Sequence, residues 1–163
     1  MQRVARVALS LLIVGLSACG GSSVSTQPVQ TTNLVINGTF TASVNGAAWG
    51  ALGRVVVTRP TANSVSLFAV STTYGFSFAL LNVTGPTTVS LVSAPSNGSQ
   101  VIASGPGQGG WATGQTGGTG SVVITALTAN HITGTFSFDA TPIPSTPTTG
   151  TLHVTSGVFD LSY

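Results

Sequence analysis

Four side chains in the C-terminal half of the chain are suited to acid–base chemistry: His131, Asp139, His153 and Asp160. Two carboxylates that flank a glycosidic bond hydrolyse it, and here that pair would have to be Asp139 and Asp160. A serine, a histidine and an aspartate on one face are the usual machinery of acyl transfer. Whether such residues meet depends on the elements that position them.

A half-buried strand is predicted at 132–140. Ile132, Gly134, Phe136, Phe138 and Ala140 fall on one face of it, and threonine, serine and aspartate fall on the other. The β-branched segment 121–127 precedes it, and the interval 128–131 is short enough to close a hairpin. We predict that this pair is the central hairpin of an antiparallel sheet.

The strand 132–140 is expected to pair with 151–158. If Asp139 faces Thr151, then Ser137 faces His153, and Ser137, Asp139 and His153 share one polar face. That arrangement has a hydrolase or metal-site look. The chain has no Gly-x-Ser-x-Gly motif, however, and polar side chains are expected on the solvent face of any strand. We therefore predict no catalytic residue, no metal site and no cofactor, and keep an envelope hydrolase as an alternative.

The alternation continues through 34–163, which we predict to be one all-β domain. Apolar residues occupy the even positions of 34–44, and Asn45–Gly46 then signals a tight turn. Further β-rich runs follow, separated by turn residues, at 54–59, 65–71, 74–83, 87–92 and 100–104. This spacing predicts an antiparallel meander of about 8–10 strands that forms a barrel or a sandwich. The Pro-rich interval 141–150 is a predicted loop, and the phase change near Ser156–Gly157 predicts a β-bulge.

Trp49, Trp111 and His153 are the candidate ligand contacts. An exposed indole ring can stack on a glycan or an apolar ligand. Trp49 follows the Asn45–Gly46 turn, where a core position is favoured over a ligand contact. Trp111 lies in the Gly-rich interval 93–119, where we expect it to anchor a loop.

Residues 1–18 have the pattern of an export signal. Two arginines precede an apolar run of about ten residues, which is too short for a helix that spans a bilayer. The signal ends in residues that resemble the lipobox of bacterial lipoproteins, namely Leu16, Ser17, Ala18 and Cys19. This resemblance implies that Cys19 is acylated and becomes the new N-terminus; an ordinary secretory signal is the alternative.

Cys19 is the only cysteine, so it forms no intramolecular disulfide, which favours its use as an acyl site. The polar segment 19–33 is predicted to be a flexible tether that ends in the lipid. Gly20 and Gly21 follow Cys19, without the aspartate that resembles an inner-membrane retention signal. We expect an exported protein held in the outer membrane, facing the periplasm or the cell surface.

Charged residues make up 4% of the chain, against roughly 25% in a typical globular domain. Lysine and glutamate are absent, and Arg54, Arg59, Asp139 and Asp160 are the charged residues beyond the signal. A surface without basic clusters cannot neutralise a phosphate backbone, so we exclude nucleic acid as a partner. The abundance of threonine and serine favours strands over helices.

Four segments resemble a family of uncharacterised bacterial lipoproteins, known only as a domain of unknown function: 40–49, 120–125, 132–138 and 154–159. Their order and spacing match over most of the chain after the signal. The chain departs from the usual family pattern in its near absence of lysine, glutamate and aspartate, and in the Gly-rich insertion around Trp111. The resemblance implies an anchored β domain and transfers no activity.

Our leading hypothesis is a lipid-anchored cell-envelope lipoprotein. Its domain would be a non-catalytic binding or structural module, with membrane lipid held through acylated Cys19 and an envelope protein or glycan as a possible partner. A carrier of a lipid, glycan or other small molecule is a second possibility. It requires an interior that is not filled by the phenylalanines of the predicted strands, Phe40, Phe76, Phe78, Phe136 and Phe138.

Overall fold

A computed structural model describes residues 37–52, 55–59, 61–92 and 98–163. The predicted signal peptide, the lipobox with Cys19, the tether and Arg54 lie outside the described residues. In the part that is described, no helix is both long and apolar enough to cross a membrane.

The described chain is an antiparallel β structure, as predicted, with two three-residue 3₁₀ turns at Pro106–Gln108 and Gly114–Thr116. The strands described are β1 (Asn37–Val44), β2 (Ala47–Gly50), β3 (Val55–Thr58), β4 (Ser64–Val70), β5 (Gly75–Leu81), β6 (Thr87–Ser90), β7 (Gln100–Ser104), β8 (Gly110–Ala112), β9 (Thr119–Leu127), β10 (His131–Pro142) and β11 (Leu152–Ser162). Asn45 and Gly46 both have positive φ, at 49° and 83°, as the predicted tight turn between β1 and β2 requires. The predicted central hairpin is the β9–β10 pair.

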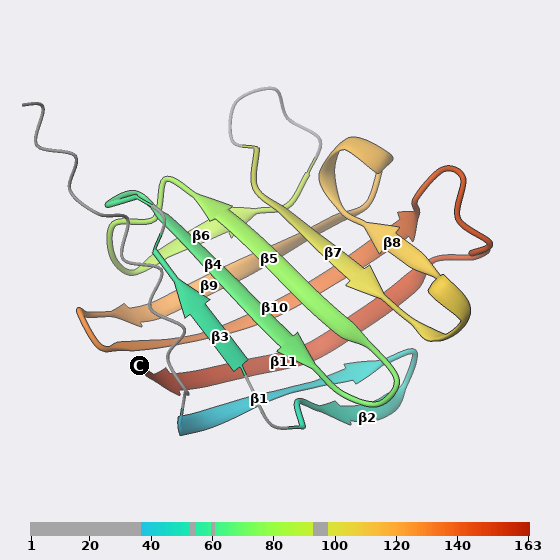
Figure 1. Cartoon of the computed structure of the whole chain (residues 1–163). Helices are drawn as coiled ribbons and strands as arrows, with labels where there is room; N and C mark the ends of the chain where they lie inside the picture. Colours follow the sequence, from blue (N-terminus) through green and yellow to red (C-terminus); the bar gives the residue numbers. More distant parts are fainter. Residues whose placement is uncertain (1–36, 53–54, 60, 93–97) are drawn as a thin grey trace, which may run out of the picture.

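The strands form one sheet that curls on itself as a half-barrel. The back layer has the order β6-β9-β10-β11-β1-β2, and the front layer has the order β8-β7-β5-β4-β3. In Figure 1, β4, β5 and β7 run diagonally across β9, β10 and β11. Strand β10 joins the layers, because it pairs with β9 up to Asp139 and then with β8 at Thr141 and Pro142.

The core lies between the two layers and is dominated by aromatic rings. Phe40 and Phe136 of the back layer have ring centroids 5.1 Å apart, and Phe136 lies equally close to Phe78 of the front layer. The carrier hypothesis requires an interior that is not filled by the five phenylalanines named above. Each of them is at most 3% exposed. They occupy the space in which an internal ligand would lie.

Strand β11 contains the predicted β-bulge. Leu152 and Val154 face the core before it, Gly157, Phe159 and Leu161 face the core after it, and Thr155 and Ser156 are both exposed. The register against β10 shifts at the same place, between Phe136 and Phe138. Ser156 has a φ of 53°, in the left-handed region that an L-residue other than glycine, asparagine or aspartate seldom adopts. The bulge therefore stores backbone strain at Ser156.

We expect the Ser156→Gly variant to unfold at a higher urea concentration than the parent. Glycine adopts positive φ without the steric cost of a Cβ atom, which stabilises the folded state. Glycine also increases the conformational entropy of the unfolded chain, and we expect the net increase in the free energy of unfolding to be about 0.5 kcal/mol. The neighbouring residue Thr155 is not among the positive-φ residues, so Thr155→Gly is a matched control that should lose about 0.5–1 kcal/mol. Equal losses in the two variants would contradict the strain.

Three features of the fold differ from the predictions. Strand β8 was not predicted, because its sequence Gly-Trp-Ala is too short to show alternation. The described strands number eleven, above the predicted range. The order is not that of a simple meander, since β1 pairs with β11, β5 with β7 and β6 with β9. Alternation identifies a strand and its buried face, but it does not identify the neighbouring strand.

Candidate functional site

The outer face of the back layer is lined with hydroxyl side chains. Because successive side chains of a strand point to opposite faces, the apolar residues of β9, β10 and β11 enter the core and the serines and threonines between them face solvent. The hydroxyls of Thr125 and Thr133 lie 2.7 Å apart across β9 and β10. This face is the one that carries the candidate acid–base residues.

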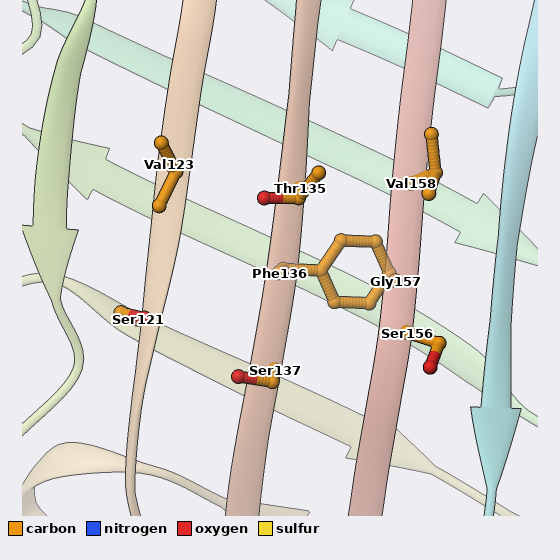
Figure 2. Close-up of a pocket in the computed structure, with 8 residues that line it drawn as sticks. All are labelled: Ser121, Val123, Thr135, Phe136, Ser137, Ser156, Gly157 and Val158. Atoms are coloured by element: carbon orange, nitrogen blue, oxygen red, sulfur yellow. The ribbon is translucent and has the colours of Figure 1, made fainter.

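A depression of about 350 Å³ lies in this face where the bulge interrupts the ladder between β10 and β11. Figure 2 shows its residues: Ser121 and Val123 on β9, Thr135, Phe136 and Ser137 on β10, and Ser156, Gly157 and Val158 on β11. Gly157 has no side chain, and the Phe136 ring extends beneath it from the neighbouring strand. Gly157 itself faces the core, so the depression in the outer face is made by the bulge, which breaks the outward alternation of β11.

A second depression, of about 260 Å³, continues along β10 and shares Ser137 with the first. It is lined by Thr119, Gly120, Ser137, Phe138, Asp139, Val154 and Thr155. We call the two together the trough. From Thr135 to Asp139 it follows β10 for four residues, which is about 14 Å of strand. Six hydroxyl side chains and one carboxylate line it.

The Asp139–His153 pair lies at one end of the trough. The two residues face each other across β10 and β11, and Asp139 Oδ1 is 2.7 Å from His153 Nδ1. Asn45 holds this end of β11, because its backbone N–H donates to the His153 carbonyl at 2.8 Å and its side-chain oxygen accepts from the His153 N–H at 2.9 Å. The predicted shared polar face is thus present. The assumed register was wrong by two residues, since Asp139 faces His153 rather than Thr151.

A second pair, His131 and Asp160, lies toward the opposite end of the same face, with Nε2 and Oδ1 2.8 Å apart. Asp160 faces Thr133, which is six residues from Asp139 along β10, so the two aspartates are about 20 Å apart. Carboxylates that act together on a glycosidic bond are at most about 9.5 Å apart. These two aspartates therefore cannot act as such a pair.

The expected Ser137–His153 contact is also not formed. In Figure 2 the Ser137 hydroxyl is directed toward β9, whereas His153 lies on β11, on the other side of β10. The Asp139–His153 pair is largely solvated, with the His153 and Asp139 side chains 61% and 56% exposed, whereas His131 of the second pair is half-buried. Within residues 37–52, 55–59, 61–92 and 98–163, no three His, Cys, Asp or Glu side chains gather in a way that could hold a metal ion.

The two tryptophans have structural positions. Trp49 is 6% exposed, packs against Phe76 with ring centroids 4.7 Å apart, and donates its indole N–H to the Tyr74 carbonyl. It belongs to the core, so its ring is not available to stack on a ligand. Trp111 is half-buried on β8 and donates its indole N–H to the Gly150 carbonyl at 3.0 Å. It fastens the 143–151 loop to β8, and it lines neither depression of the trough.

Of the three candidate ligand contacts, His153 lies closest to the trough, through its bond to Asp139. The hydroxyls of Ser121 and Thr135 were not singled out by sequence analysis, because serine and threonine are common throughout this chain. Ser137 was singled out with Asp139 and His153 as one polar face, and the predicted bulge was the second signal that pointed to this place.

The lining of the trough is rich in hydrogen-bonding groups. Each hydroxyl can both donate and accept a hydrogen bond, and the exposed Val158 supplies apolar contact between them. Asp139 is the one lining residue with an ionisable side chain, and it is already paired. A neutral ligand with many hydroxyl groups matches this lining, since it offers donors and acceptors and brings no charge that must be neutralised.

No family model, no curated protein and no solved structure matches this chain.

Proposed function

We propose that this protein is a lipid-anchored lipoprotein of the cell envelope whose β domain is a non-catalytic binding module. The lipobox ending in Cys19 and the polar segment that follows it support the anchor. The trough supports the binding role, and its ligand would be a neutral, hydroxyl-rich molecule such as an envelope glycan. The outer membrane is the proposed location.

The observation that carries the binding role is the position of the trough at the β-bulge of β11. Along a regular strand every second side chain points outward. At the bulge the two exposed residues Thr155 and Ser156 are consecutive, Ser156 adopts a strained conformation, and an opening of about 350 Å³ lies beside them among hydroxyl groups. That volume falls at the lower end of the range of small-molecule sites, about 300–1,000 Å³.

Ser137 lines both depressions, so we expect Ser137→Phe to abolish glycan binding by filling the trough. The side chain at 137 is exposed, and phenylalanine is tolerated in strands, so the variant should keep its fold. Binding would be measured by titrating the detergent-solubilised protein with neutral oligosaccharides of glucose and of N-acetylglucosamine while its amide resonances are recorded. The Ser137→Ala variant, which loses one hydroxyl, should bind about 2–10-fold more weakly.

Thr41→Phe is the matched control for this experiment. Thr41 is exposed on β1, faces Val158 across the ladder and lines neither depression. Its variant should bind like the parent. If no oligosaccharide shifts the resonances of trough residues in the parent, or if both phenylalanine variants bind equally well, the glycan proposal is wrong.

A further inference from the structure

The outer face of the front layer carries an apolar row that crosses the strands. Val56 faces Phe68, Phe68 faces Ser77, and Ser77 faces Ile102, so the four side chains form one line across β3, β4, β5 and β7. Phe68 is 46% exposed and Ile102 is 40% exposed. We call these four residues, three of them apolar with Ser77 between Phe68 and Ile102, the apolar row.

The two outer faces of the domain differ in chemistry. Strands β4, β5 and β7 contain no ionisable residue, and Arg59 follows the end of β3. Beside the row on the same face lie Val70 and Ala79, both half-buried, and the polar side chains Ser66, Gln100 and Ser104. The opposite face carries both His–Asp pairs and the hydroxyl trough. The strands of one face thus carry no charge and expose Phe68 and Ile102, and the other face carries the ionisable pairs.

We propose that the apolar row rests on the surface of the membrane that holds the lipid anchor, so that the trough on the opposite face points away from the membrane. This proposal depends on the proposed function in one respect, the acylation of Cys19. To that anchor it adds the orientation of the domain on the membrane. A membrane-facing front layer keeps the ligand site accessible to molecules in the aqueous space.

The size of the row favours a lipid surface over a protein partner. Neighbouring strands are about 4.8 Å apart, so a row across four strands is about 14 Å wide and covers on the order of 200 Å². A stable protein–protein interface buries about 800 Å² on each partner. An apolar side chain can enter the headgroup region of a bilayer without a matching shape, and a neutral face needs no anionic lipid.

The anchor makes a weak contact sufficient. Residues 20–36 separate Cys19 from β1, and an extended chain advances at most about 3.6 Å per residue, so β1 stays within about 60 Å of the lipid. The lipid anchor holds the domain at a high effective concentration near the membrane. A contact between the apolar row and the bilayer that is too weak to bind the free domain can then form for much of the time. The anchor supplies the attachment, so the contribution required of Phe68 and Ile102 is to favour one orientation of the domain over the others.

The test uses the full chain, made in bacteria and placed in phosphatidylcholine vesicles that contain a phosphatidylcholine with a photoactivatable acyl chain. After illumination, lipid adducts are mapped to peptides. We expect adducts on the β4 and β7 peptides at several times the yield on the β10 and β11 peptides. In the Phe68→Ser, Ile102→Ser double variant this difference should disappear. Val92→Ser is the matched control, since Val92 is an apolar residue that follows β6 of the back layer, is 38% exposed and lines neither depression, and its loss should leave the adduct distribution as in the parent.

Each other outcome separates the two proposals. If the chain floats with the vesicles but adducts are spread evenly or fall on β10 and β11, the orientation is wrong and the anchor stands. If Cys19 carries a free thiol, acylation is wrong. The same thiol is then coupled to a maleimide phospholipid and the labelling is repeated, so the row is tested in either case. If the double variant dissociates an oligomer in detergent, the row binds a second copy and the lipid proposal is wrong.

Discussion

The Cys19→Ala variant is expected to lose all incorporation of a palmitate analogue and to leave the membrane fraction. Cys19 is the only cysteine in the chain, so no other thiol can accept the acyl group. Each acyl methylene contributes about 0.8 kcal/mol to membrane attachment, so loss of several chains is expected to change the protein from fully bound to fully released. Metabolic labelling and fractionation of cells that produce each form measure both effects.

A variant that restores the thiol elsewhere tests whether the lipobox, and not the thiol alone, directs acylation. In the Cys19→Ala background, Ser22→Cys places a thiol three residues beyond the lipobox. Neither labelling nor membrane attachment should return. Labelling of Cys19→Ala at the level of the parent would show that the anchor proposal is wrong.

Gly157→Ala is expected to destabilise the domain by about 3 kcal/mol, the upper end of the usual cost of overpacking a core. A Cβ atom at position 157 would lie 2.5 Å from the Phe136 ring. That ring cannot move aside, because Phe40 and Phe78 each lie 5.1 Å from it, centroid to centroid. Thermal unfolding followed by circular dichroism should show a Tm lower by roughly 10 °C.

The control for this steric explanation is Gly50→Ala, which adds the same methyl group to a strand glycine. The new Cβ would have Thr41 Cγ2 as its nearest neighbour, at 3.8 Å, an ordinary van der Waals contact. Its Tm should stay within about 2 °C of the parent. Combining Gly157→Ala with Phe136→Leu should recover part of the loss, because the smaller side chain vacates the space that the methyl needs. Equal Tm values for the two alanine variants would contradict the steric role of Gly157.

The strands were predictable wherever side chains alternate. Phe136 and Phe138 marked the buried face of β10, and the phase change after Val154 marked the bulge in β11. The pairing of distant strands was not predictable. The Thr-rich strands share the same alternation of polar and apolar residues, so their sequences do not distinguish one neighbour from another. The register between β10 and β11 was wrong by two residues for the same reason.

The candidate site was predictable in part. Asp139 and His153 were placed on one polar face, and they do meet. The trough beside them lies at the bulge of β11, where Ser156 has a positive φ; the phase change predicted the bulge but not the depression beside it. Trp49 lies in the core, as its position beside the Asn45–Gly46 turn favoured, and so it does not contribute to the site.

The pairing of β1 with β11 has a consequence for when the domain folds. The Asn45 side chain bonds a residue 108 positions away, and β1 has its longer partner at the very end of the described chain. A chain delivered with its N-terminus first therefore carries β1 unpaired along one edge until the last strand arrives, and such non-local pairing makes folding slow. If the chain is exported as proposed, the β1–β11 pair can form only after β11 has been delivered.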